Sequence, residues 1–131
     1  MTIKPSIAVV DDDEAVADAT VDLLRALGFI AKGFRSADDF LKSSRIRITS
    51  CLIADVQMSG MSGLELYGRL VALGTPIPTI LITAYPDEQI RARALNAGVA
   101  GYLTKPFSEK ELLDCIELAM KHGALLTPVR R

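Results

Sequence analysis

The chain is poor in the residues that mark several common classes of protein. Its 131 residues include two cysteines, one histidine and no tryptophan, and aromatic residues make up only 5%. Neither Cys51 nor Cys115 has a second cysteine or a histidine at zinc-ligand spacing, so we expect two buried, reduced, apolar thiols. Because aromatics are scarce while 50% of residues are apolar, the core should be aliphatic. The length suits one compact domain.

The charge balance and the apolar runs exclude further classes. Fifteen basic residues face 16 acidic ones, and a net charge of −1 gives no electrostatic footprint for DNA or RNA. No apolar stretch is long enough to span a membrane, and the first five residues lack the apolar part of a signal peptide. We therefore expect a cytoplasmic protein that contacts neither membranes nor nucleic acid directly.

Apolar runs alternate with amphipathic segments along the chain. This alternation predicts an α/β fold, a doubly wound, flavodoxin-like sheet of five parallel strands in the order 2-1-3-4-5. The expected strands cover residues 6–10, 29–34, 51–55, 79–82 and 101–104, and the expected helices cover 14–27, a short segment after 36, 64–73, 87–97 and a segment after 108.

Smaller features complete this picture. In the first helix, the face expected to be buried carries Val16, Ala19, Leu23, Leu24 and Leu27. Ser108 and Glu111 should form a capping box at the start of the last helix. Residues 43–50 are expected to be a loop. We place the domain at residues 1–122, with residues 123–131 as a C-terminal tail or the start of a linker.

Acidic residues stand at the ends of two of the apolar runs. Asp11 and Asp12 follow the first run, Asp55 ends the third, and Lys105 follows the fifth. In an open α/β sheet these carboxyl ends lie at one edge, where such folds bind ligands. Two carboxylates about 4 Å apart repel each other by roughly 4 kcal/mol at an effective dielectric of ~20. A divalent metal together with the lysine would offset that repulsion, which indicates a site for phosphate chemistry.

Four short segments together resemble the response-regulator receiver domain of two-component signalling, in the CheY-like superfamily. They are Val9-Val10-Asp11-Asp12, the run from Ile53 to Met58, Ile82-Thr83-Ala84, and the run from Gly101 to Phe107. Their order and their places at strand ends make the match specific, and it covers about residues 5 to 122. Within the family, the chain looks most like FixJ-type receivers.

The resemblance implies that Asp55 is the phosphoacceptor of a signalling switch rather than a residue of a turnover enzyme. A carboxylate can act as the nucleophile and yield an aspartyl phosphate. The implied cofactor is Mg²⁺, with Mn²⁺ as a substitute. Asp12 would bind the metal directly and Asp11 through water, while Asp55 and the backbone carbonyl of Gln57 would supply further oxygens.

The same resemblance assigns the residues around the phosphoryl group. Lys105 would contact one phosphoryl oxygen as a point cation, and Thr83 would donate its hydroxyl to another. Pro106 would follow a cis peptide bond, as the family usually has it. Thr83 and Tyr102 would form the switch, which reshapes the face made by residues 87–97, 101–104 and the last helix.

The sequence departs from the family pattern near the phosphoacceptor. The family usually has proline after Met58, whereas this chain has Ser59, so we expect a more flexible loop. Gln57 and Tyr85 occupy positions whose side chains flank the hydrolytic water in the family. A long amide and a bulky aromatic there predict slow autodephosphorylation.

The implied partner is a histidine kinase or a histidine phosphotransfer protein. It would dock on the first helix, at Ala15, Val16 and Ala19. Phosphorylated receivers often dimerise, so a phosphorylation-dependent dimer is a further expectation.

Two alternatives stay open at this stage. One is a degenerate receiver that acts as a binding module. The other is a small Mg²⁺-dependent phosphatase with an aspartate nucleophile, although such enzymes usually carry an acid where this chain has Gln57. The sequence also leaves open whether the receiver stands alone or belongs to a longer transcriptional regulator.

Overall fold

A sheet of five parallel strands forms the centre of the molecule. The computed structural model describes residues 5–126, with side chains for residues 5–121. The strand order is β2-β1-β3-β4-β5, which confirms the predicted doubly wound sheet. In chain order the elements are β1 (Ser6–Val10), α1 (Glu14–Ala26), β2 (Ile30–Phe34), α2 (Ala37–Lys42), the 3₁₀ helix η1 (Ser44–Arg47), β3 (Cys51–Asp55), α3 (Gly63–Ala72), β4 (Thr79–Thr83), α4 (Glu88–Ala97), β5 (Gly101–Thr104) and α5 (Glu109–Leu126).

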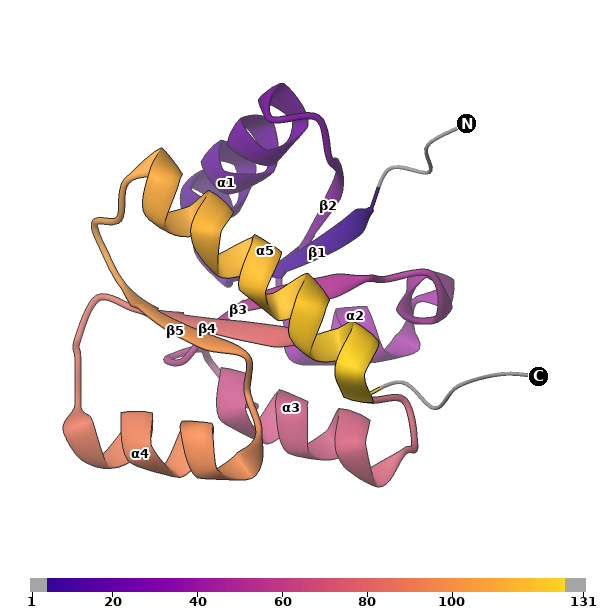
Figure 1. The fold of residues 1–131 in the computed structure, drawn as a ribbon, viewed down its shortest axis with the longest axis vertical. Coiled ribbons are helices and arrows are strands. Elements are labelled where there is room, and N and C mark those ends of the chain that lie inside the picture. The colour runs from indigo at the N-terminus through magenta and orange to yellow at the C-terminus, as the bar shows by residue number, and fades with distance from the viewer. Residues whose placement is uncertain (1–4, 127–131) are drawn as a thin grey trace.

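Helices cover both faces of the sheet (Figure 1). α1 and α5 pack on one face, where Leu24 and Leu112 are buried. α2, α3 and α4 pack on the other, where Phe40, Leu66 and Ala94 are buried. Successive residues of a strand point to opposite faces, so each inner strand supplies both cores. This is why the inner strands β1, β3 and β4 are largely apolar along their whole length rather than alternating.

The buried face of α1 differs from the predicted one. The helix buries Ala17, Thr20, Val21 and Leu24. Of the five residues expected there only Leu24 is buried, and Ala19 is exposed. The prediction was wrong because it followed large apolar side chains and passed over Thr20. The Thr20 hydroxyl donates to the carbonyl of Val16 at 2.9 Å, so it can be buried with its hydrogen bond satisfied.

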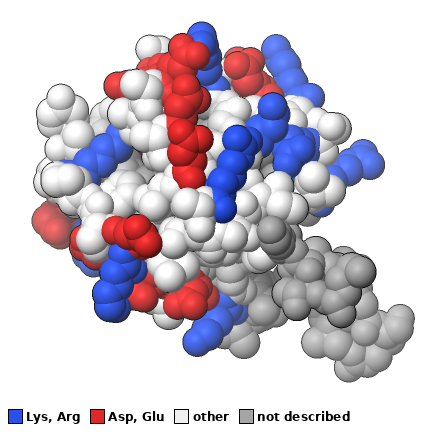
Figure 2. All heavy atoms as spheres, turned by 90° about the horizontal axis from the view of Figure 1, so that it is seen from above, with Lys and Arg blue, Asp and Glu red and all other residues white. Residues whose placement is uncertain are grey.

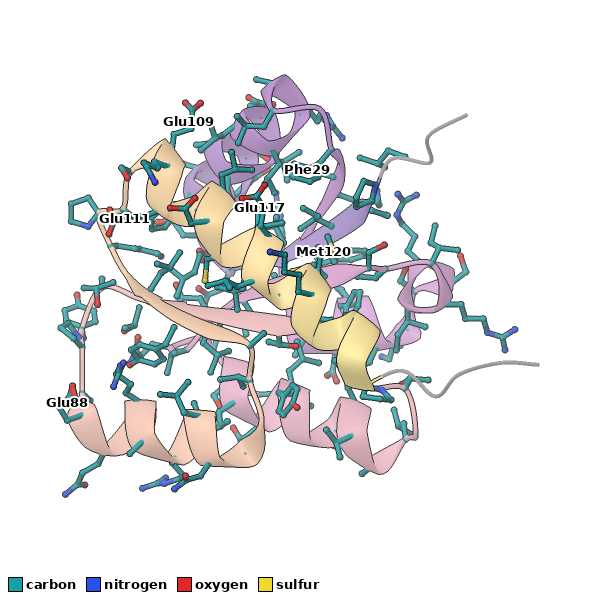
Figure 3. The ribbon with its side chains drawn as sticks, viewed as in Figure 1. Phe29, Glu88, Glu109, Glu111, Glu117 and Met120 are labelled. Carbon is teal, nitrogen blue, oxygen red and sulfur yellow. The ribbon has the colours of Figure 1, made fainter. Side chains whose placement is uncertain are left out.

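Polar side chains close the starts of the helices. The predicted capping box of α5 is confirmed, since the amide of Glu111 donates to Ser108 Oγ at 3.0 Å and the amide of Ser108 donates to Glu111 Oε1 at 2.9 Å. An equivalent box joins Ser62 and Glu65 at the start of α3, and it was not predicted. Glu88 and Glu111 lie at the starts of α4 and α5 (Figure 3), where negative charge offsets the helix dipole.

Both cysteines are free and lie in the core between the sheet and the α1–α5 layer. Cys51 is fully buried, as expected, whereas Cys115 is only half-buried, which differs from the expectation of two buried thiols. Burial raises the pKa of the Cys51 thiol to about 12. The thiolate is the reactive form, so Cys51 is chemically inert in the folded protein.

The remaining features concern the ends and the surface. α5 continues to Leu126, past residue 122, and the last five residues of the expected tail lie outside the described part. Residues 43–50 contain η1 instead of a plain loop. None of the described helices is long and apolar enough to cross a membrane. Acidic and basic side chains intermingle on the face shown in Figure 2, in keeping with a net charge of −1.

Candidate functional site

The carboxyl ends of the strands bring distant residues to one edge of the sheet. Asp55 ends β3 beside β4, and Thr83 ends β4 opposite the last residue of β5. Asp11 and Lys105 directly follow the last residues of β1 and β5. The loops from β4 to α4 and from β5 to α5 leave the sheet on this side, at the left in Figure 1. The parallel sheet therefore assembles the predicted group of charges.

Lys105 joins two of the predicted carboxylates. Its Nζ donates to Asp55 Oδ2 at 2.9 Å and to Asp11 Oδ2 at 3.3 Å. The side chains of Lys105, Asp11 and Asp55 are only 22%, 7% and 11% exposed, so salt screens these ion pairs less than surface pairs. The Lys105 amide donates to the carbonyl of Thr83 at 2.8 Å, and the bond to Pro106 is cis.

Burial and neighbouring charges shift the pKa values of this group. Burial raises the pKa of Asp11, and the hydrogen bond from the amide of Asp13 and the charge of Lys105 only partly offset the rise. For Lys105 burial alone would lower the pKa, but the hydrogen bond to Asp55 and the charges of both acids raise it overall. The lysine is therefore cationic at neutral pH. For Asp11 the raised pKa means that its ionised form lowers the free energy of unfolding. Such concentrations of buried charge are typical of functional sites.

Asp12 does not join this group. Its Oδ2 accepts a hydrogen bond from the backbone amide of Ser59, in the loop between β3 and α3, at 2.9 Å. Within residues 5–121, no three acidic, histidine or cysteine side chains lie close enough together to hold a metal ion. The structure thus brings Asp11 and Asp55 together on Lys105 and leaves Asp12 apart.

The chemistry of the donor set nevertheless fits a hard divalent cation. Asp11, Asp12 and Asp55 offer carboxylate oxygens at one edge, and Mg²⁺ prefers oxygen ligands and needs few from the protein. A hollow of about 590 Å³ is bordered by Asp12, Gln57 and Ser59 but not by Asp11 or Asp55. Asp12 can join Asp11 and Asp55 around a cation only if its side chain turns away from Ser59.

Gln57 connects the phosphoacceptor candidate to the switch candidate. Its amide donates to Asp55 Oδ1 at 3.0 Å, and its Oε1 accepts the hydroxyl proton of Thr83 at 2.7 Å. The Thr83 hydroxyl is fully buried and also accepts from the amide of Tyr85 at 2.9 Å. Tyr85 is 74% exposed, and Gln57 is also exposed but makes hydrogen bonds to Asp55 and Thr83.

Tyr102 on β5 is turned into the protein. It packs against the core between the sheet and the α2–α4 layer. In the part of the chain with described side chains, its hydroxyl is the one buried polar side-chain atom that lacks a hydrogen-bond partner. An unpaired buried hydroxyl costs about 1–3 kcal/mol, so the inward position of Tyr102 is energetically unfavourable.

Replacing this hydroxyl by hydrogen should therefore stabilise the protein. For Tyr102→Phe we expect the free energy of unfolding to rise by about 1 kcal/mol, because the ring keeps its packing and the unpaired group is removed. Urea denaturation of both proteins measures the difference. A loss of stability in the variant would show that the hydroxyl has a favourable interaction.

Gly63 lies against the backbone of Asp55. A Cβ at this position would be 2.4 Å from the carbonyl oxygen of Asp55 and 3.0 Å from Leu81 Cδ2. This requirement for glycine cannot be seen in the sequence, because a close approach between segments leaves no local signal. The bare backbone of residue 63 thus lets α3 start against the end of β3.

The two glycines of α3 give a matched prediction. Gly63→Ala should lower the free energy of unfolding by about 2 kcal/mol or more, because the added carbon overlaps a backbone atom that cannot move away freely. Gly68→Ala adds a carbon where nothing lies within 4 Å, and should stabilise the helix by about 0.5–1 kcal/mol. Chemical denaturation of both variants checks this, and equal effects of the two changes would contradict the close contact.

The predicted docking residues lie on the outer side of α1. Ala15 and Ala19 are exposed, and Val16 is half-buried. The amide of Val16 donates to Asp13 Oδ1 at 3.2 Å, which caps the helix. This exposed, small-residue surface begins just after Asp11 and Asp12, so a partner seated there would lie near the charged edge.

Residues 7–117 match the family model described as "Response regulator receiver domain". Response regulator protein TmoT of Ectopseudomonas mendocina is 42% identical over 115 residues, which make up 88% of this chain and 52% of that protein. Transcriptional regulatory protein FixJ of Bradyrhizobium diazoefficiens is 35% identical over 123 residues, 94% of this chain and 60% of that protein. The chain spans about half the length of the curated relatives it matches.

Solved structures show the same architecture. The crystal structure of FixJ-N has 31% sequence identity and a TM-score of 0.84, over 98% of this chain and 100% of that one. The structure of response regulator StyR has 41% identity and a TM-score of 0.84, over 94% of this chain and 62% of that one. The fold and the sequence therefore point to the same group of proteins.

Proposed function

The chain belongs to the response-regulator receiver family, and on that premise we propose that Asp55 accepts a phosphoryl group from a phosphohistidine of a histidine kinase or a histidine phosphotransfer protein. The observation that chiefly supports this role is the shielded Asp55 carboxylate, hydrogen-bonded by Lys105 and by the amide of Gln57 at the end of β3. The Thr83 hydroxyl lies at the neighbouring strand end.

In the proposed step, a carboxylate oxygen of Asp55 attacks phosphorus and the bond from phosphorus to the imidazole nitrogen breaks, with the electron pair left on the imidazole. When bound by Asp11, Asp12, Asp55 and the carbonyl of Gln57, Mg²⁺ would neutralise charge on the carboxylates and on the incoming group. Positioning and neutralisation are most of what phosphoryl transfer requires of a protein.

Lys105 has two tasks in this scheme. Before transfer it reduces the repulsion between Asp11 and Asp55, to which it donates hydrogen bonds. After transfer it would donate to a phosphoryl oxygen, since an ammonium group carries three donors. The same cation thus stabilises the negative charge of both states.

The switch would act through the Thr83 hydroxyl, which has one proton to donate. In the present arrangement Gln57 Oε1 takes that proton, and a phosphoryl group on Asp55 would compete for it. Movement of Thr83, together with movement of Tyr102, whose inward hydroxyl is unpaired, would change the face of α4, β5 and α5. Phosphorylation shifts this equilibrium only by its differential affinity for the two states.

The output lies beyond this domain. We propose that the receiver controls a transcriptional regulator, because FixJ is named as one and the chain spans only part of its length. Ala15, Val16 and Ala19 would dock the phosphodonor, and the α4–β5–α5 face would support a phosphorylation-dependent dimer.

Incubation with a small acyl phosphate and Mg²⁺, followed by intact-mass measurement, tests the function. The wild type should gain one phosphoryl group, Asp55→Ala none, and Asp38→Ala, which removes an exposed carboxylate on α2, one group as in wild type. No adduct on a folded wild type would overturn the proposal. That result would favour a binding module instead. The separation of Asp12 from Asp11 and Asp55 also supports that alternative.

A further inference from the structure

The Asp12 carboxylate is held by a segment far away in the chain. Asp12 follows β1, and its Oδ2 accepts from the backbone amide of Ser59, 47 residues later, at 2.9 Å. None of the ion pairs among residues 5–121 involves Asp12, whereas Asp11 and Asp55 both pair with Lys105. The Ser59 amide therefore provides the hydrogen bond that fixes this carboxylate in place.

We propose that the backbone N–H of Ser59 holds Asp12 out of the metal site and so competes with Mg²⁺ for this carboxylate. The inference rests on the proposed function, in which Asp12 is a metal ligand. In the present arrangement Asp12 is not gathered with Asp11 and Asp55. To join them the side chain must rotate, and the rotation breaks or stretches its bond to Ser59.

The identity of residue 59 decides whether this competition exists. The bond uses the backbone amide, which every residue except proline carries. The Ser59 side chain takes no part in it, so alanine would preserve the bond and proline would remove it. Residue 59 is thus a positioning residue that lowers the affinity of the site for metal.

The size of the effect follows from the surroundings of the bond. Its acceptor is ionised, which strengthens the interaction, but Asp12 and Ser59 are both exposed to water. Loss of one such hydrogen bond from the metal-free state should tighten Mg²⁺ binding by roughly three- to tenfold. A larger change would require additional effects.

Calorimetric titration with MgCl₂ of wild type, Ser59→Ala and Ser59→Pro tests the proposal. We expect the dissociation constant of Ser59→Pro to fall roughly three- to tenfold and that of Ser59→Ala to stay within about twofold of wild type. Equal or weaker binding by a folded Ser59→Pro would overturn the inference alone. If no protein binds Mg²⁺, the metal role of the proposed function fails together with it.

Proline could also tighten binding by stiffening the loop, or could prevent folding, so a second measurement uses the wild-type chain. In its ¹⁵N–¹H spectrum, saturation with Mg²⁺ should move the Ser59 amide proton upfield and speed its exchange with solvent, because Asp12 leaves it. In Asp12→Ala the same amide should exchange fast before any metal is added. An amide that remains protected in Mg²⁺-saturated wild type would overturn the inference, whatever the proline variant shows.

Discussion

Lys105→Met is expected to lower the free energy of unfolding by about 3 kcal/mol, because it leaves two shielded carboxylates without their cation. Asp11 and Asp55, which are 7% and 11% exposed, would then face each other with no offsetting charge. The same change should slow phosphorylation of Asp55 by about a hundredfold or more, since a cation that stabilises charge in the transition state is lost.

The pH and metal dependence of this variant follow from the same charges. The pKa of Lys105 is raised in the folded state, so its contribution to stability is present at neutral pH and is lost only above the ordinary lysine range. The loss in free energy of unfolding caused by Lys105→Met should become smaller at acid pH. There Asp11, whose pKa is already raised, becomes protonated and no longer repels Asp55. Mg²⁺ should raise the melting temperature of the variant more than that of wild type.

Lys110→Met is the matched control. Lys110 pairs with Asp114 on α5 at 2.8 Å, but the two side chains are 84% and 52% exposed. Removing this exposed pair should change stability by less than about 1 kcal/mol and leave phosphorylation unchanged. Urea denaturation and acyl-phosphate labelling measure both effects. Equal losses in the two variants would contradict a special role for Lys105.

Gln57→Ala is expected to speed autodephosphorylation by roughly tenfold, a reduction of the barrier by about 1.4 kcal/mol. The backbone amide of Gln57 donates to Asp55 and its side chain accepts from Thr83, so this residue lies against the carboxylate that would bear the phosphate. Its loss admits water and leaves the Thr83 proton without its acceptor. Tyr85→Ala should have a smaller effect, because that side chain is 74% exposed.

Gln89→Ala, at an exposed glutamine on α4, serves as the control and should decay like wild type. The phosphorylated proteins are freed of the phosphodonor, and loss of the adduct is followed by intact mass. If Gln57→Ala decays no faster than Gln89→Ala, Gln57 does not shield the phosphoryl group.

Patterns that repeat along the chain made the sheet predictable. The bounds of β1, β3 and β5 agree with the expected ones. β1 and β3 are continuous apolar runs because they are buried on both faces, whereas β5 is only partly buried. The strand order then placed Asp11, Asp55, Thr83 and Lys105 at one edge. The spacing of apolar residues gave the wrong buried face for α1. That face includes Thr20, whose hydroxyl donates a hydrogen bond within the helix.

The details of the site depend on contacts that leave no local pattern. The bond from the Ser59 amide to Asp12 joins segments 47 residues apart and involves a group that almost every residue has. The hydrogen bond from Thr83 to Gln57 and the close approach of Gly63 to Asp55 are likewise set by packing. The capping box of Ser62 and Glu65, by contrast, had a readable signal in the S-x-x-E spacing.

The most direct test of the account asks which atom carries the phosphoryl group. Borohydride reduces an acyl phosphate to an alcohol, so an aspartyl phosphate becomes homoserine at the modified position. After labelling with acyl phosphate and Mg²⁺, reduction and peptide mass spectrometry, homoserine should be found at position 55. An adduct that yields homoserine at position 11 or 12, or none at all, would contradict Asp55 as the phosphoacceptor.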